Sequence, residues 1–275
     1  TVSMHIKKLE REVGTPLLVR DKEGLKLTES GKILYCYGQQ LLETKGQALS
    51  AIQDERRIVK GHLEIAASSV PGAYLLPRLL QSFCRKYSEV TFSLLLRDTR
   101  QVLQSVKDYT YYMAFTGEPG LRKGLGQISL VEDELIVVAS PKIKIPIPEQ
   151  ASTALPEVAL HDCCDLPFLL REPGSATRMV FEKALKKQSV KNIDLNIIGY
   201  LESQEAIKEA AKAGLGITVI SQKAVEDELK AGLLKGYKLK GIPIKRNFYL
   251  VFRKQSIFPP LNKAFFQFTR EYFHR

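Results

Sequence analysis

The fold is decided by residues 1–31, TVSMHIKKLEREVGTPLLVRDKEGLKLTESG. Val2, Ile6 and Leu9 recur at the spacing of one helix face, while polar and basic side chains occupy the positions between them. Gly14 ends this pattern, as a glycine at a helix C-terminus does. A basic amphipathic helix is by itself more often a solvated surface helix than a binding element. The residues that follow are therefore needed to distinguish a surface helix from a binding element.

A charged hairpin follows this helix directly. Residues 17–19 and 25–27 are short apolar runs, and the turn Asp21-Lys22-Glu23-Gly24 joins them. A helix followed at once by such a hairpin has the order of elements found in a winged DNA-binding unit.

A long helix is predicted next. Thr28-Glu29-Ser30 is a suitable helix start, and residues 28–59 contain no proline. At about 1.5 Å per residue this segment would form a rod of nearly 50 Å, which is too long for one side of a small domain. Seven-residue spacing indicates a partner helix, so we expect a dimerising linker whose contact residues are Leu34, Leu41, Ala48 and Ile52.

These motifs, in this order, resemble the start of a LysR-type transcriptional regulator. The resemblance rests on Thr1-Val2-Ser3-Met4-His5-Ile6-Lys7-Lys8-Leu9-Glu10, Pro16-Leu17-Leu18 and Leu27-Thr28-Glu29-Ser30-Gly31. It implies a partial winged helix-turn-helix over residues 1–31 that binds a double-stranded DNA operator. In the family about one more helix and a turn precede this point, so we expect an N-terminally truncated chain.

The recognition helix and wing would contact DNA in two ways. Ser3, Met4 and His5 occupy positions that reach base edges, with Thr1 at the start of the same helix. Lys7, Lys8, Lys22 and Lys26 are better placed for phosphates.

Composition supports this interpretation only in part. The chain has 275 residues, 44% of them apolar, which is enough for more than one core, and a formal net charge of +11. Most of the excess charge lies outside the first 61 residues, in the C-terminal segment 230–275. Bulk charge therefore adds only steering and non-specific attraction to DNA. No long apolar run or signal peptide is present, so we expect a cytoplasmic protein without membrane contact.

The rest of the chain alternates strands and helices, which is typical of an α/β fold. We expect strands at 62–67, 90–96, 112–115, 134–139, 167–171, 195–200, 216–220 and 248–253, and helices at 77–87, 177–187, 204–213 and 261–273. The resemblance implies a periplasmic-binding-protein-like effector domain of two subdomains, joined by two crossover strands. The expected division is a linker helix at 32–61, effector subdomain I at 62–138 and 252–275, and effector subdomain II at 139–251.

Hydroxyl, amide and basic groups gather at the predicted ends of these strands. Ligands in such sheets bind at the carboxyl ends, where loops and helix N-termini present backbone N–H groups. The expected effector-binding residues are Ser68, Ser69, Val70, Thr99, Thr116, Arg171, Ser175, Thr177, Glu202 and Ser203. Ordinary helix capping explains any single one of them equally well. The arginines would suit a small anionic effector, unless Glu172 neutralises one of them.

Catalytic and cofactor-binding functions have little support in the sequence. The four histidines do not form a recognisable triad with a nucleophile and a carboxylate. His161-Asp162-Cys163-Cys164 lacks a second ligand pair at zinc-finger spacing, so no metal and no cofactor are expected. The competing interpretation is a solute-binding protein or an enzyme with the same two-lobed fold, but such a protein would lack residues 1–59. We expect a regulator rather than an enzyme, acting as a homodimer, with tetramers as a further assembly known in the family.

Overall fold

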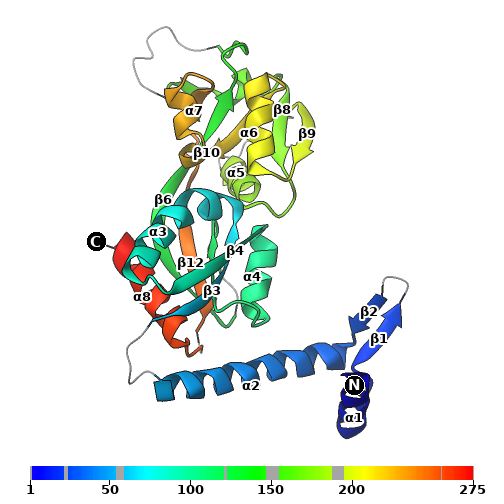
Figure 1. The fold of residues 1–275 in the computed structure, drawn as a ribbon. Helices are drawn as coiled ribbons and strands as arrows, with labels where there is room; N and C mark the ends of the chain where they lie inside the picture. The colour runs from blue at the N-terminus through cyan, green and yellow to red at the C-terminus, as the bar shows by residue number, and fades with distance from the viewer. Residues whose placement is uncertain are drawn as a thin grey trace.

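The structure is a computed structural model that describes residues 2–21, 24–53, 59–120, 123–146, 155–187, 195–254 and 256–274. Its N-terminal part contains α1 (Val2–Val13), β1 (Leu18–Asp21), β2 (Gly24–Leu27) and α2 (Glu29–Gln53) (Figure 1). The antiparallel pairing of β1 with β2 confirms the predicted hairpin, and α2 confirms the predicted long helix as far as it is described. Thr1 and Lys22 lie outside the described residues.

Two side chains and one glycine join α1, the β1–β2 hairpin and α2. The Glu10 carboxylate accepts hydrogen bonds from the backbone N–H groups of Leu17, at 2.8 Å, and Leu18, at 3.3 Å. The Thr28 hydroxyl donates to the Pro16 carbonyl and accepts from the N–H of Gly31, at 2.7 and 3.0 Å. A Cβ at Gly31 would lie 2.0 Å from the Leu17 carbonyl oxygen, so only glycine permits this approach.

The rest of the described chain forms two lobes, in each of which helices cover both faces of the sheet (Figure 1). In lobe I the strand order is β4-β3-β5-β12-β6. Its elements are β3 (Gly61–Ser68), η2 (Pro71–Leu75), α3 (Leu76–Lys86), β4 (Val90–Arg97), α4 (Thr99–Lys107), β5 (Met113–Thr116), the first part of β6 (Leu125–Ala139), β12 (Lys245–Arg253) and α8 (Pro260–Phe273). Phe83, Phe115 and Phe265 join α3, the sheet and α8 on one face, and α4 covers the other.

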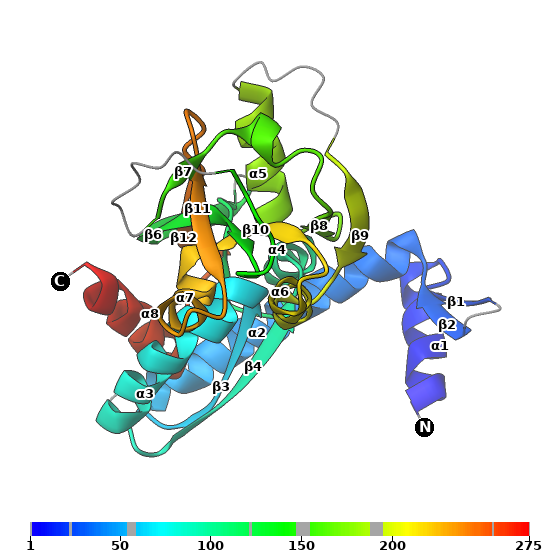
Figure 2. The same ribbon diagram turned by 90° about the horizontal axis from the view of Figure 1, so that it is seen from above.

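Lobe II continues the same sheet in the order β6-β10-β8-β9. Its further elements are β7 (Glu157–Val158), η3 (Leu160–Asp162), β8 (Phe168–Arg171), α5 (Ala176–Lys187), β9 (Ile197–Leu201), α6 (Gln204–Ala213), β10 (Ile217–Ser221), η4 (Gln222–Ala224), α7 (Glu226–Lys230) and β11 (Lys235–Leu239). Helices α5 and α6 lie on opposite faces of this sheet (Figure 2).

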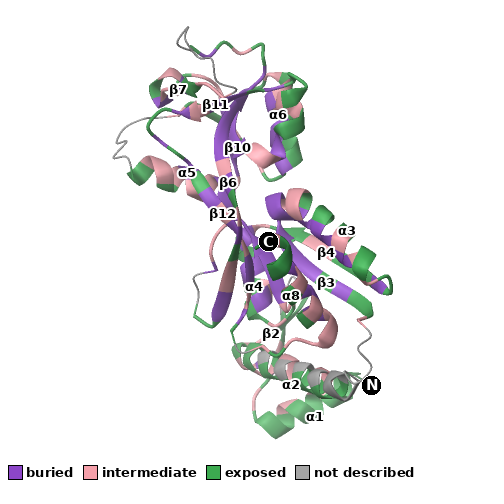
Figure 3. Ribbon diagram, turned by 90° about the vertical axis from the view of Figure 1, so that its left-hand side faces the viewer, coloured by how far each residue is buried: buried purple, intermediate pink, exposed green. Residues whose placement is uncertain are grey.

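Strands β6 and β12 connect the lobes, and β6 belongs to both (Figure 3). Residues 125–134 of β6 pair with β12, whereas residues 135–139 pair with β10 and β11. The change of partner therefore falls between Glu134 and Leu135, before the expected boundary at 138/139. On the return strand, Leu250 and its neighbours pair with β5 of lobe I, so the crossover precedes the expected boundary at 251/252 as well.

Several elements differ from the sequence-based expectation. Strand β6 begins at Leu125 rather than Glu134 because its first half pairs with β12 inside lobe I. Helix α4 and strand β11 were not predicted; Val102, Leu103 and Val106 form a buried helical stripe in α4 that the sequence does contain. No described helix is both long and apolar enough to cross a membrane.

We predict that Gly31→Ala lowers the stability of the N-terminal unit by roughly 1–3 kcal/mol, because the added methyl group overlaps the Leu17 carbonyl. Gly46→Ala on the same helix is the control, since a Cβ there meets no atom within 4 Å and alanine favours the helix. Thermal unfolding of both variants measures the difference. Equal melting temperatures for the two would contradict the close packing at Gly31.

Candidate effector site

A narrow cleft lies between the lobes where the predicted strand ends meet. Its volume is only about 10 Å³, which is room for about one water molecule. The cleft is lined by Ser68, Ser69, Val70, Pro71, Asp98, Thr99, Gly117, Arg171, Glu172, Ser175, Ala176, Thr177 and Arg246. Seven of the ten expected effector-binding residues thus line one cleft: Ser68, Ser69, Val70, Thr99, Arg171, Ser175 and Thr177.

The other three expected residues lie outside the cleft lining and make structural contacts. The Thr116 hydroxyl donates to the Glu118 carbonyl at 2.7 Å. Ser203 caps α6 by accepting a hydrogen bond from the Ala206 N–H at 3.2 Å, and the Glu202 carbonyl accepts from Arg171. Ordinary capping, the alternative left open by the sequence, therefore describes Ser203.

Helix N-termini face the cleft from both lobes. From lobe I, Asp98 caps α4 by accepting from the Gln101 N–H at 2.9 Å, and Thr99 follows it at the start of the helix. From lobe II, Ala176 and Thr177 form the first turn of α5. Thr99 is buried, and its hydroxyl has no hydrogen-bond partner among the described residues. The unpartnered Thr99 hydroxyl and the N-terminus of α5 favour an acceptor group in the cleft, whereas the Asp98 carboxylate already compensates the N-terminus of α4.

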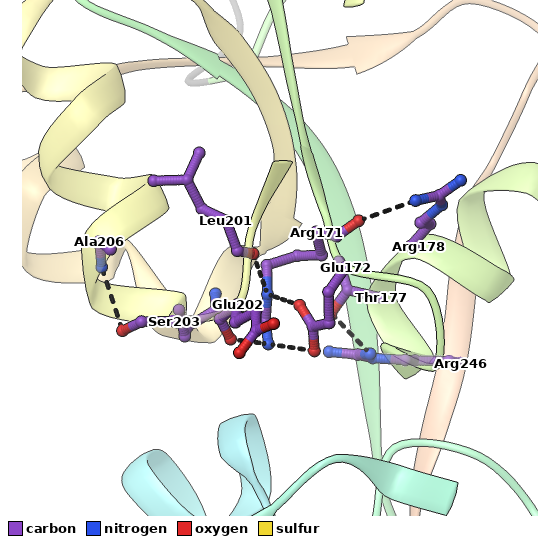
Figure 4. A network of polar contacts seen from close by, with 10 residues as sticks. Arg171, Glu172, Thr177, Arg178, Leu201, Glu202, Ser203, Ala206 and Arg246 are labelled. Atoms are coloured by element: carbon purple, nitrogen blue, oxygen red, sulfur yellow. Dashed lines mark hydrogen bonds and ion pairs between the residues drawn. The ribbon is translucent and has the colours of Figure 1, made fainter. Parts of the chain in front are cut away.

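Arg171 is held in place by its own lobe (Figure 4). Its guanidinium donates to both carboxylate oxygens of Glu172, at 2.8 and 3.0 Å, and to Gln204 at 2.6 Å. It also donates to the carbonyls of Leu201 and Glu202, at 3.2 and 2.7 Å. The possibility that Glu172 neutralises an arginine is therefore the one that the structure shows, and Arg171 joins β8 to the loop after β9.

Arg178 is likewise paired. Its guanidinium donates to Glu182, one turn further along α5, at 2.7 Å. It also donates to the Arg171 carbonyl at 3.2 Å (Figure 4). The same group lies 5.0 Å from the ring centroid of Tyr200. Neither arginine of the expected anion site is thus available without breaking an ion pair.

Arg246 is the basic residue of the cleft that sequence reasoning missed. It lies opposite Asp133 in the register of β12 with β6, and its Nε donates to the Asp133 carboxylate at 2.8 Å. Its Nη1 donates to the Thr177 hydroxyl at 3.2 Å, and the Ser221 hydroxyl donates to the other oxygen of Asp133 at 2.7 Å. Arg246 Nη2 is buried and has no partner among the described residues.

Burial and glycine packing fix the position of this guanidinium. Burial lowers the pKa of Arg246 from its ordinary value, while the charge of Asp133 acts in the opposite direction. A Cβ at Gly117 would lie 3.1 Å from Arg246 Nη1, so the missing side chain leaves room for the group. The sequence carries one signal for this residue: Arg246, Phe248 and Leu250 alternate on the buried face of β12.

A second polar group links the lobes beside the cleft. The Tyr74 hydroxyl of lobe I donates to Glu205 of lobe II at 2.5 Å, and Lys208 Nζ pairs with Glu205 and Glu228 at 3.0 and 2.9 Å. Burial and the contact with Glu205 raise the pKa of Tyr74 to about 12, so its hydroxyl stays protonated as the donor. Among the described residues, no three His, Cys, Asp or Glu side chains gather as a metal site requires.

Comparisons with known families agree with this architecture. The model of the LysR substrate binding domain matches residues 56–274, and that of the bacterial regulatory helix-turn-helix protein, lysR family, matches residues 1–32. The chain belongs to the LysR family of transcriptional regulators. Its LysR relatives include the "Probable RuBisCO transcriptional regulator" of Emiliania huxleyi, 34% identical over 248 residues, which are 89% of this chain and 77% of the relative. The protein of the same description from Nostoc sp. is 31% identical over 269 residues, 97% of this chain and 78% of the relative.

Several solved structures share the fold. A full-length OxyR variant from Pseudomonas aeruginosa has a TM-score of 0.75 at 18% identity, covering 98% of this chain and 84% of that one. The regulatory domain of Synechocystis CcmR in complex with 2-PG has a TM-score of 0.67 at 24% identity, covering 78% and 98%. The effector binding domain of QuiR in complex with shikimate has a TM-score of 0.66 at 20% identity, with the same coverage.

Proposed function

We propose that this LysR-family regulator binds a double-stranded DNA operator under the control of a small anionic effector in the interlobe cleft. The observation that carries the effector assignment is the pair of buried polar atoms without a described partner, Arg246 Nη2 and Thr99 Oγ1. An unsatisfied buried donor is costly, and a bound acceptor would remove that cost. The two atoms belong to residues that line the same cleft.

The unpartnered Nη2 donor of Arg246 favours an acidic acceptor, although the charge of the guanidinium is already paired with Asp133 through Nε. Its guanidinium and the N-terminus of α5 both attract negative charge, and the guanidinium offers a charge-assisted hydrogen bond. The ligands named for the CcmR and QuiR domains, 2-PG and shikimate, are both small anions. In this proposal Ser68, Ser69, Val70, Thr99, Ser175 and Thr177 contact the effector, Arg171 positions the lobe II loops, and Thr116, Glu202 and Ser203 support the lining.

Effector binding would act on the angle between the lobes. Ser68 and Thr99 belong to lobe I and Ser175 and Thr177 to lobe II, so a ligand that touches both sets favours one closure angle over others. The narrow cleft requires the lobes to separate for entry, which would strain the contact between Tyr74 and Glu205. In this proposal, a change in the angle between the lobes would alter how the N-terminal units of the dimer are placed on DNA.

The proposed DNA contacts lie on an exposed helix face and on the wing. Ser3, Met4, His5, Lys7 and Lys8 of α1 are all exposed, and Lys26 is exposed on β2. Base-edge contact by the first three residues and phosphate contact by the lysines suit a recognition helix in the major groove.

The proposed homodimer rests on apolar side chains of the linker helix α2. Leu41 is 72% exposed and Leu42 67%, and Ala48 is exposed as well, while Leu34 is half-buried. The side chain of Ile52 lies outside the described residues. A partner helix would remove this apolar surface from water.

We predict that Thr99→Val raises the free energy of unfolding by about 1 kcal/mol, because it removes an unsatisfied buried hydroxyl at nearly constant volume. The same substitution should lower the affinity for the effector roughly threefold to tenfold, since one hydrogen bond is lost. A thermal-shift screen of small metabolites, oxoanions included, identifies the ligand, and calorimetric titration measures its affinity.

Thr218→Val provides the matched control for this prediction. The Thr218 hydroxyl is also buried and without a described partner, but it lies in β10 outside the cleft lining. The Thr218→Val substitution should raise the free energy of unfolding without changing the affinity for the effector. An equal loss of affinity in both variants, or in neither, would contradict the cleft assignment.

Lys8→Ala should weaken binding to a random-sequence DNA duplex and reduce the slope of log affinity against log salt by about one, because one phosphate contact is lost. Ser3→Ala should leave that affinity unchanged, since base-edge contacts contribute only at a specific site. Fluorescence anisotropy at several salt concentrations tests both. A normal salt slope for Lys8→Ala would place this side chain away from the phosphates.

Leu41→Glu should dissociate the dimer, because it places a charge within the apolar stripe of α2. Lys32→Glu, at an exposed position on the opposite face of the helix, should leave the molecular mass unchanged. Light scattering coupled to size-exclusion chromatography measures the mass. A dimer that survives Leu41→Glu would refute the linker contact.

A further inference from the structure

A second and larger cavity adjoins the narrow cleft at the crossover. We call it the hinge cavity; its volume is about 450 Å³, within the range of small-molecule sites. It is lined by residues 117–119, by Val180, Lys183, Ala184 and Lys187 of α5, and by residues 242–247 and Tyr249. Gly117 and Arg246 belong to the lining of both the cleft and the hinge cavity. The two spaces therefore meet at the Arg246 guanidinium.

One face of α5 forms a wall of this cavity. Val180, Lys183, Ala184 and Lys187 follow one another at three- and four-residue spacing, so they share one side of the helix. The valine and alanine side chains form an apolar surface between exposed amino groups. No ion pair of Lys183 or Lys187 occurs within the described part of the chain, in contrast to Lys245, which pairs with Glu132 at 3.0 Å.

The geometry of α5 separates the cationic groups of the cavity. Arg246 contacts Thr177 in the first turn of α5, and Lys183 lies six residues further along the helix. At about 1.5 Å per residue, the backbone positions of Thr177 and Lys183 are roughly 9 Å apart along the helix axis. The Lys183 side chain leans toward the helix N-terminus, which brings its amino group closer to Arg246 along this axis. Lys187 lies one turn beyond Lys183. The cavity thus has one buried cation at its cleft end and two exposed cations along its length.

The charge of the lining favours more than one acidic group on a ligand. Of the lining cations, Arg246 is paired with Asp133 and Lys245 with Glu132, so the amino groups without a described ion pair are those of Lys183 and Lys187, against one described lining carboxylate, Glu118. Burial raises the pKa of Glu118, while Lys183 and Arg246 act in the opposite direction. Lys183 and Lys187 therefore give the side chains of the lining an excess of positive charge over Glu118.

We propose that the hinge cavity binds an organic anion with two acidic groups, one at Arg246 and the other at Lys183 and Lys187, with its apolar body against Val180, Ala184 and Ile244. This inference rests on the proposed function, because the first acidic group is the one that the cleft would recognise. It adds a ligand class: a dianion of several atoms in length rather than a compact monoanion. The cavity has the room that the narrow cleft lacks.

The experiment compares α,ω-dicarboxylates of four to eight carbons with monocarboxylates of equal length, by calorimetric titration of the full chain. At one or more chain lengths the dicarboxylate should bind at least tenfold more tightly than the monocarboxylate. The double variant Lys183→Met and Lys187→Met should abolish this preference and leave monocarboxylate affinity unchanged. Lys186→Met is the control, since Lys186 lies on α5 outside the cavity lining and should preserve the preference.

Three results would overturn the proposal, and they separate it from the proposed function. Monocarboxylates that bind in a Thr99-dependent manner with no preference for dicarboxylates would refute the hinge cavity while the cleft assignment stands. A preference that survives the double lysine variant would likewise refute it. If no carboxylate of either series binds, both the hinge-cavity proposal and the anion assignment of the cleft fail.

Discussion

The ion pair between Arg246 and Asp133 is the interaction on which the arrangement of the effector domain depends. Both side chains are almost completely buried, at 4% and 0% exposure, and they lie on the two strands that connect the lobes. Breaking a buried pair by removing one partner typically costs about 3–5 kcal/mol, because the remaining charge is left uncompensated. Ser221 and Thr177, both from lobe II, add hydrogen bonds to it, and Arg246 Nη2 keeps no described partner. The crossover, the cleft and the hinge cavity therefore meet at one guanidinium.

The sequence predicts well those parts of the chain whose signals are local. The hairpin turn, the proline-free linker helix and most strands of both lobes follow from spacing within a few residues. Gly31 is required because the Leu17 carbonyl approaches it closely. The motif at residues 27–31 therefore indicates a contact between the start of α2 and the residues before β1. Strand β6 is less predictable because its two halves pair with different partners, and no local pattern marks where β10 replaces β12.

The sequence places most candidate site residues at strand ends, but it does not show which of their side chains are already paired. Ser69 and Thr99 lie together because the parallel strands β3 and β4 end at the same edge of lobe I, and Thr177, after the end of β8, meets them from lobe II. Arg171 was expected to hold the anion, yet its donors are occupied by Glu172, Gln204 and two carbonyls, and pairings of this kind depend on side-chain geometry. Arg246 was missed because it lies in a segment rich in lysine and arginine, where its burial beside Phe248 is visible only in the alternation of the strand.

Strand β6 also limits how the gene for this protein can change in length. Successive side chains in a strand point to opposite faces, so one inserted residue between Asp133 and Leu135 would turn every later side chain of β6 to the other face. Val137, now packed in one core of lobe II, would exchange faces with Val138, which is packed in the other. If the lobes were joined by a loop, the same insertion would leave the packing of both cores unchanged. Homologous chains should therefore vary in length at the loops around this crossover, and the strand itself should tolerate substitution far better than insertion or deletion.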